Sequence, residues 1–375
     1  MADNSTLSTK PVHAQVREAI IERLVDMPLG ARLATEVEMA EEFKVSRGSV
    51  RLALRGLEEE GFLIRHRSRG TFLSRPIDPD QVSACDPDTS VTNASVGLLI
   101  SETRINFHSM IMSGFGKAAS LAGYSMFLYD SKLDHDNERK MLKDLRGRQD
   151  LAGLAVLPYD TDSFDPDYSM LIRDITDSGI KVVLVDQYIA DMELPVVAMN
   201  KVRIGYMATE HLIMLGHERI CYICSASYET AGRDCLVGYK RALKDYDIEF
   251  DADLIIDIPP MYCAVPTRDA IIEKLTANPR AFTAVATPWF SGTYGIMGAL
   301  QALRLRAPDD IAVVGGDMYE NPDMCYVTHT LQDPLKMGEE AFKLLVREDD
   351  GDEPMKLHQL LKPSLVIGET CGARK

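Results

Sequence analysis

The sequence predicts an α+β domain of three helices and a hairpin, followed by a two-lobed α/β domain with parallel sheets. The chain has 375 residues, which is more than one ordinary domain. Its first 75 residues contain three helical patterns and two short strand patterns. From residue 95 onward, short apolar runs alternate with amphipathic stretches of about ten to fifteen residues, which is typical of βα units that build a parallel sheet.

The three N-terminal helices are predicted from their spacing and their caps. Over residues 12–25, apolar residues recur every four positions on one face. Thr35 and Glu38 form a capping-box pattern for a second helix. Ser46 is a good N-cap for a third, which we expect to continue to about residue 60. The tight connection between the last two helices is typical of a helix-turn-helix.

Basic residues gather in this region. Residues 44–75 contain eight Lys and Arg against three Glu, although the whole chain has a net charge of −16. Arg47, Arg51 and Arg55 recur on one face of the third helix, which suits the major groove of DNA. Strands at 62–64 and 71–73 flank a tip with further arginines, which suits the adjacent minor groove. The alternative is a small structural domain whose arginines form a solvated face.

Residues 11–74 closely resemble the GntR-family winged helix. The resemblance rests on Leu33–Glu36, on the run Val45–Leu54, on Glu60–Leu63 and on Arg69–Phe72. It implies that Arg47 contacts bases. It also implies that Ser46, Ser49 and Arg51 fix the phosphates and that Arg67 and Arg69 carry the wing contacts. The full predicted DNA-binding set is Lys44, Ser46, Arg47, Ser49, Arg51, Arg67 and Arg69. Val37 and Ser68 depart from the family's common pattern, so operator preference is expected to differ.

The predicted organisation is a DNA-binding domain over residues 1–75, a linker over 76–94 and an α/β effector and dimerisation domain over 95–371. The linker is rich in Pro, Asp, Ser and Thr. Strands are predicted at 96–101, 125–130, 153–158, 181–186, 220–224, 282–286 and 311–315. Because about 280 residues exceed one compact sheet, two lobes are expected.

Ligands of open α/β folds bind beyond the C-terminal ends of the strands. Aromatic, acidic, amide and basic residues are predicted to gather there, and this mixture suits a sugar: polar groups bind its hydroxyls and a ring covers its apolar face. The predicted ligand-binding set is Phe107, Tyr159, Asp186, Arg233, Trp289, Asp317 and Gln332. Each of them alone is more often an ordinary loop residue.

Residues 95–370 resemble the effector domain of LacI/GalR-type repressors, itself similar to periplasmic sugar-binding proteins. The resemblance rests on segments 205–212, 215–220, 233–239 and 308–317, and on Gln332 with Gly338. It implies sugar contacts by Asp186, Arg233 and Asp317, with Phe107 as a stacking ring and Gln332 nearby. Thr287–Phe290 replaces the family's usual Asn-Asp pair, and Met318 a second aspartate. The ligand is therefore expected to be a deoxy, pentose or derivatised sugar, or not a sugar. A GntR-type winged helix joined to such a domain is similar to arabinose-type repressors.

Other function classes are disfavoured. An enzyme would need a catalytic motif, but the sequence contains no GxSxG, P-loop or GxGxxG, and Cys221 and Cys224 read as part of a buried strand. Neither a metal nor another cofactor is expected. Seven scattered cysteines, an N-terminus without an apolar signal core and no run long enough to span a membrane predict a cytoplasmic protein. We expect a homodimer on a palindromic DNA operator, with repression relieved by the effector as the favoured sign.

Overall fold

The structure is a computed structural model. It describes residues 12–25, 27–28, 30–59, 62–66, 70–74, 94–148, 150–158, 166–189, 192–259, 263–317, 326–347 and 358–373. The chain divides into two compact units, the first formed by residues 1–93 with the short segment Leu121–Tyr124 and the second by the rest of the chain from Ala94. Within the described residues, no helix is both long and apolar enough to cross a membrane.

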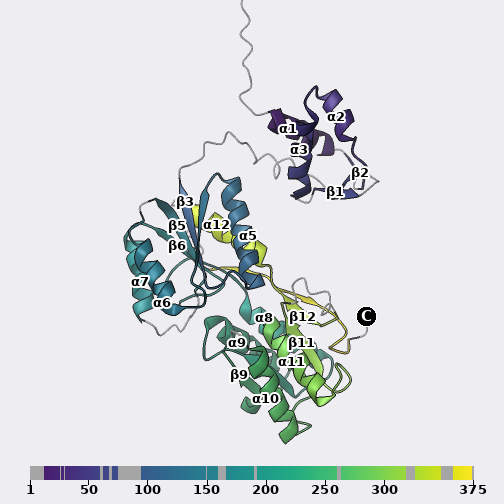
Figure 1. Cartoon of the computed structure of the whole chain (residues 1–375). Helices are drawn as coiled ribbons and strands as arrows, with labels where there is room; N and C mark the ends of the chain where they lie inside the picture. Colours follow the sequence, from purple (N-terminus) through teal and green to yellow (C-terminus); the bar gives the residue numbers. More distant parts are fainter. Residues whose placement is uncertain are drawn as a thin grey trace, which may run out of the picture. The chain divides into compact units, whose positions relative to one another are not determined.

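The first unit has the predicted three helices and hairpin. Its elements are α1 (Val12–Val25), α2 (Glu36–Glu42), α3 (Arg47–Glu59), β1 (Leu63–His66) and β2 (Gly70–Leu73). β1 and β2 pair antiparallel, and Arg32 adds one bridge to Phe72. Val16, Ile20, Val50 and Leu57 meet in a single apolar core. This is a winged helix-turn-helix, as the sequence predicts (Figure 1).

The second unit has two lobes, each built on a six-stranded sheet (Figure 1). The sheet of the first lobe has the order β13-β7-β6-β5-β3-β4, and all its strands are parallel. The elements of this lobe are β3 (Ser95–Ile100), α5 (Asn106–Leu121), β4 (Ser125–Asp130), α6 (His135–Leu145), β5 (Leu151–Val156), α7 (Pro166–Asp177), β6 (Lys181–Val185), β7 (Val196–Met199), α12 (Pro334–Val346) and β13 (His358–Leu361).

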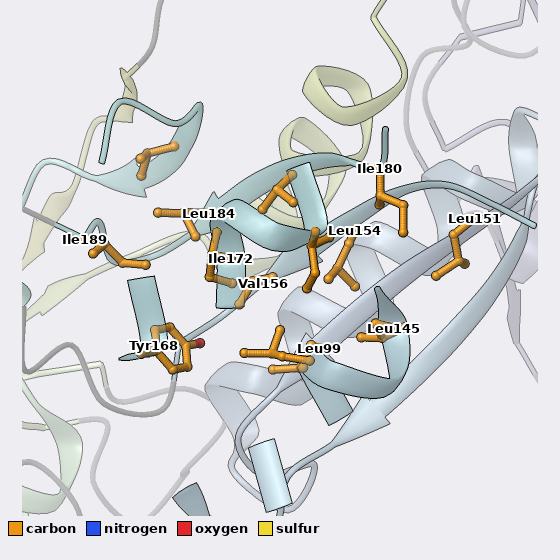
Figure 2. Packing of buried hydrophobic residues seen from close by; sticks show 14 of the residues in the cluster. Leu99, Leu145, Leu151, Leu154, Val156, Tyr168, Ile172, Ile180, Leu184 and Ile189 are labelled. Carbon is orange, nitrogen blue, oxygen red and sulfur yellow. The ribbon is translucent and has the colours of Figure 1, made fainter. Parts of the chain in front are cut away.

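The inner strands β3, β5, β6 and β7 are buried on both faces, which explains their nearly continuous apolar sequences, whereas the edge strands β4 and β13 are partly exposed. Figure 2 shows the core on one face, where Leu99, Leu154 and Val156 of the strands pack with Leu145 of α6 and Ile172 of α7. α5 and α12 cross closely enough that a Cβ on Gly114 would lie 1.9 Å from the carbonyl oxygen of Leu335.

The sheet of the second lobe has the order β14-β12-β11-β10-β8-β9, and only β14 is antiparallel to its neighbour. α10 and α11 cover the face that carries Cys221, Ile223 and Val285. The elements of this lobe are α8 (Lys201–Met214), β8 (Ile220–Cys224), α9 (Thr230–Asp245), η1 (Ala252–Leu254), β9 (Ile255–Asp257), α10 (Ala264–Ala277), β10 (Ala284–Ala286), α11 (Phe290–Leu303), β11 (Ala312–Gly316), β12 (His329–Leu331) and β14 (Ser364–Val366).

The chain passes between the two lobes three times. It leaves the first lobe after β7, returns after β12 and leaves again between β13 and β14. Neither lobe is therefore continuous in sequence. The crossings bring Asn200–Lys201 and Gln332 to the junction of the lobes, where the candidate ligand site lies.

Candidate functional site

The turn between α2 and α3 exposes the N-terminus of α3. Lys44 has a left-handed backbone with φ 54°, which allows the tight turn, and its side chain is exposed. The Ser46 hydroxyl accepts a hydrogen bond of 3.1 Å from the backbone N–H of Ser49. Arg47, the first residue of α3, is also exposed. An uncovered basic helix end of this kind can enter a DNA groove.

Glu36 links α3 to the hairpin. Its Oε2 accepts hydrogen bonds of 3.1 and 2.9 Å from Nε and Nη2 of Arg51, and its Oε1 accepts one of 3.0 Å from Nη2 of Arg65. The hydrogen bonds of Arg51 are the largest influence on the pKa of Glu36, and the net effect is a lowered pKa despite partial burial. Glu36 thus fixes two of the basic side chains. The predicted wing residues Arg67 and Arg69 lie outside the described residues.

A cavity of about 410 Å³ opens between the two lobes of the second unit. The residues that line it come from the ends of strands and from the starts of helices in both lobes, as expected for a two-lobed α/β fold. They are Ser101, Ile105, Phe107, His108, Leu157, Pro158, Asp186, Gln187, Lys201, Glu229, Ala264, Trp289, Phe290, Ser291, Tyr294, Asp317 and Gln332.

Asp186 and Asp317 occupy matching places, each directly after a strand of its lobe. Asp186 follows β6 and Asp317 follows β11. Both have left-handed backbones, with φ 66° and φ 48°. Such a conformation costs free energy in a residue other than glycine, although Asp tolerates it better than most, and it is often found at functional sites. Here it directs two carboxylates to the same cavity.

Lys201 joins these groups at the junction of the lobes. Its Nζ lies 2.7 Å from Oδ1 of Asp186 and donates a hydrogen bond of 2.8 Å to Oε1 of Gln332. Gln332 in turn donates from its backbone N–H and from Nε2 to Asp317. Burial is the largest single influence on the pKa of Lys201 and lowers it, but Asp186, Cys235 and Asp317 together outweigh burial, so the pKa is raised. Lys201 is therefore a buried ammonium ion.

Glu229 is a buried carboxyl group that also lines the cavity. It is the N-cap residue of α9, and it accepts hydrogen bonds from the Ser225 hydroxyl and, at 3.3 Å, from Nε2 of Gln187 in the first lobe. Burial raises its pKa to about 7, although these hydrogen bonds and Lys201 oppose the shift. The Gln187–Glu229 bond connects the two lobes across the site.

His108 supplies a neutral imidazole. Burial lowers its pKa, and its Nδ1 lies 3.1 Å from the carbonyl oxygen of Glu102. That contact favours a proton on Nδ1, so that Nε2 is a hydrogen-bond acceptor.

Aromatic rings provide the apolar part of the cavity. Trp289, the single tryptophan of the chain, Phe290 and Tyr294 come from the start of α11, and Phe107 comes from α5. Nζ of Lys201 lies 5.6 Å from the centroid of the Phe107 ring. The arrangement can bind a small molecule that has both hydroxyl groups and an apolar face.

The structure brings together five of the seven residues predicted for the ligand site: Phe107, Asp186, Trp289, Asp317 and Gln332. Tyr159 lies outside the described residues. Arg233 is not among the lining residues, and its Nε donates to the carbonyl oxygen of Ala226. Sequence reasoning did not select Lys201 or Glu229. Glu229 lies five residues after the predicted strand at 220–224, which was an available signal, whereas Lys201 follows β7, for which no strand was predicted.

Among the described residues, no group of three His, Cys, Asp or Glu could hold a metal ion. Cys221 and Cys224 are buried in β8, as expected, and burial raises the pKa of each thiol to about 12. Such thiols are poor nucleophiles.

Comparisons with known proteins match both units. Residues 9–73 match the bacterial regulatory proteins of the gntR family, and residues 209–371 match the periplasmic binding protein-like domain. The chain is 25% identical over 374 residues to an arabinose metabolism transcriptional repressor of Geobacillus stearothermophilus, covering 96% of this chain and 97% of that protein.

Solved structures of transcription regulators have the same fold as most of this chain. The transcription regulator CcpA of Lactococcus lactis is 23% identical with a TM-score of 0.64, over 74% of this chain and 99% of that one. A transcriptional regulator CelR–cellobiose complex is 23% identical with a TM-score of 0.63, over 90% of this chain and 100% of that one.

Proposed function

We propose that this chain, a DNA-binding transcriptional regulator in which a gntR-family domain precedes a periplasmic-binding-protein-like domain, represses transcription until a carbohydrate binds between the lobes of that second domain. One observation carries the proposal: the same chain has an exposed basic helix end, at Arg47, and a cavity of about 410 Å³ between two lobes.

The DNA-binding half rests on α3 and its surroundings. Arg47 would read bases, most naturally a guanine through O6 and N7. Lys44, Ser46, Ser49 and Arg51 would hold phosphates, and Arg67 and Arg69 would contact DNA from the wing. Serine hydroxyls and arginines suit phosphate binding, and such contacts fix the position of the helix along the DNA.

The effector half rests on the chemistry of the cavity. Carboxylates, amides and hydroxyls can bind sugar hydroxyls, and Trp289 or Phe107 can cover an apolar sugar face. Relatives named for arabinose metabolism and for a cellobiose complex support a carbohydrate. We place the DNA-binding domain at residues 1–75, the linker at 76–94 and the effector domain at 95–371. The effector domain would bind its ligand without changing it chemically, and the protein would act in the cytoplasm.

A homodimer would give the protein two recognition helices. One α3 contacts few base pairs, whereas two copies related by a two-fold axis would read a palindromic operator. β4 is an edge strand of its sheet and exposes Phe127 and Leu128, which supports a contact between effector domains. Closing the lobes on a ligand would then change the spacing of the two DNA-binding domains, with a coupling of about 1–3 kcal/mol.

The test is fluorescence anisotropy of labelled DNA from upstream of the protein's own gene. We expect saturable binding that resists unrelated competitor DNA and that one carbohydrate weakens. If unrelated competitor DNA displaces the labelled DNA as well as unlabelled upstream DNA does, at every salt concentration, sequence-specific regulation is contradicted. Specific binding that no carbohydrate alters would contradict only the carbohydrate assignment.

A further inference from the structure

The charges that line the cavity do not balance. Among its described lining residues, Asp186, Glu229 and Asp317 carry carboxyl groups, and Lys201 is the single lysine or arginine. Nor does the sequence contain a lysine or arginine in 159–165 or 318–325, the segments that come next in the chain after β5 and β11. The site is therefore rich in negative charge and in hydrogen-bond acceptors.

Lys201 is already engaged within this set. It neutralises Asp186 at 2.7 Å and donates to Gln332. The donors that Glu229 receives from Ser225 and Gln187 are uncharged. Uncharged donors stabilise a carboxylate but do not cancel its charge, so a buried excess of negative charge is costly until a cation enters.

The pKa of Glu229 responds to this situation. Because burial raises it to about 7, the empty site can reduce its own charge by binding a proton there. A positively charged ligand would replace that proton. The titratable neighbours that influence Glu229 are Asp186 after β6, Lys201 at the start of α8, Cys224 in β8, Cys235 in α9 and Cys263 before α10. The thiols have raised pKa values and stay neutral, so Glu229 is the group that changes charge near pH 7.

The aromatic rings favour the same kind of ligand. Ring faces attract cations, and Phe107, Trp289, Phe290 and Tyr294 all line the cavity. Lys201 already lies 5.6 Å from the centroid of the Phe107 ring. Rings beside carboxylates are the usual surroundings of bound ammonium groups.

We propose that the effector is a polyhydroxylated molecule that carries an ammonium group, that is, a sugar of the amino-sugar class, whose cationic group lies against Glu229 and the aromatic rings. This inference rests on the proposed function, because it assigns the charge of the effector. It excludes phosphorylated and carboxylated sugars, whose charge the cavity repels.

The first test uses matched sugars that differ in charge. Binding is followed through the fluorescence of Trp289, the only tryptophan of the chain, and by calorimetry. The first set is D-glucosamine, D-glucose and D-glucuronate, which are an amino, a neutral and a carboxylated sugar. The second set is D-galactosamine, D-galactose and D-galacturonate. We expect each amino sugar to bind at least about tenfold more tightly than its neutral counterpart at about pH 7, where the amino group is still protonated, and the difference to shrink at about pH 5.5, where Glu229 is protonated as well.

The second test needs no effector. Caesium, iodide and acrylamide are positive, negative and neutral quenchers of tryptophan. We expect caesium to quench Trp289 better than iodide, and Glu229→Gln to reduce that preference. The control is Glu273→Gln, which removes the same charge from an exposed position of α10 and corrects for the acidity of the whole protein.

The inference is overturned if a neutral sugar binds as tightly as its amino counterpart, or if no amino sugar binds with a Kd below about 10 mM. It is also overturned if Glu229→Gln and Glu273→Gln change the quenching of Trp289 equally. A neutral sugar that releases the operator would leave the proposed regulator intact. Loss of specific operator binding would contradict the proposed function instead, whatever the sugars do.

Discussion

Lys201 and Gln332, which are 131 positions apart in the sequence, are joined by a hydrogen bond of 2.8 Å. Each lies where the chain crosses between lobes, and each lines the cavity. Their bond therefore ties two of the three crossings to the wall of the ligand site. A ligand that displaces either side chain would act directly on two of the segments that connect the lobes.

Removing the ammonium ion from this junction should destabilise the effector domain. Lys201→Met leaves Asp186, whose side chain is only 14% exposed, without its counter-ion, and we expect a cost of up to about 3–5 kcal/mol in denaturant unfolding. Asp186→Asn added to Lys201→Met should recover part of this loss, because asparagine tolerates the left-handed backbone. Equal stability of Lys201→Met and the native protein would show that the pair is unimportant for folding.

The helix pair α8–α9 should not tolerate a methyl group at its crossing. A Cβ on Gly205 would lie 1.9 Å from the carbonyl oxygen of Cys235, so Gly205→Ala must separate the helices. We expect a loss of about 1–3 kcal/mol or more in thermal or denaturant unfolding. Gly147→Ala is the control, since nothing lies within 4 Å of its Cβ position, and it should change stability by less than about 0.5 kcal/mol.

Glu36→Gln should weaken the DNA-binding domain in a pH-dependent way. The bonds of Arg51 and Arg65 lower the pKa of Glu36, so its stabilising effect is present above the usual carboxyl pKa and is lost as the pH falls through the lowered value. Because both arginines are largely exposed, we expect only about 0.2–1 kcal/mol at neutral pH. Thermal unfolding should show the difference from the native protein vanish in acid; a constant difference would assign it to another cause.

Arg47→Ala should remove sequence-specific DNA binding. The side chain is exposed at the start of α3, so folding should be unaffected while a base contact worth about 1–3 kcal/mol is lost. Anisotropy against operator and scrambled DNA measures the loss, and Arg280→Ala, an exposed arginine of the effector domain, is the control. An Arg47→Ala protein that still prefers the operator as strongly as the native protein would refute the role.

Local patterns were enough to predict most of the architecture. The capping pair Thr35–Glu38 and the apolar runs at β3, β4 and β8 gave helices and strands within a few residues of those observed, because their hydrogen bonds and burial depend on nearby sequence. The strands β7, β9, β12, β13 and β14 were not predicted. Each has only three or four residues, which is too short for a clear local pattern, and β13 pairs with β7, in which Val196 lies 162 positions before its partner His358.

Some residues of the ligand site could likewise be predicted from the sequence, and others could not. Residues that directly follow strands, such as Asp186 and Asp317, could be predicted because parallel strands carry their C-terminal ends to one edge. Lys201 could not, because its importance comes from two crossings that meet only in the folded chain. Arg233 shows the reverse: its place in the sequence suits a ligand contact, but its Nε is used by the carbonyl oxygen of Ala226.

The three crossings also set the order in which the protein can be completed during synthesis. The first lobe needs α12 and β13, and the second needs β14, so the first sheet is not whole until residue 361 has left the ribosome and the second not until residue 366. The winged helix needs nothing beyond residue 74. A ribosome that adds about 5–20 residues per second therefore exposes a finished DNA-binding domain for many seconds before an effector domain exists to control it.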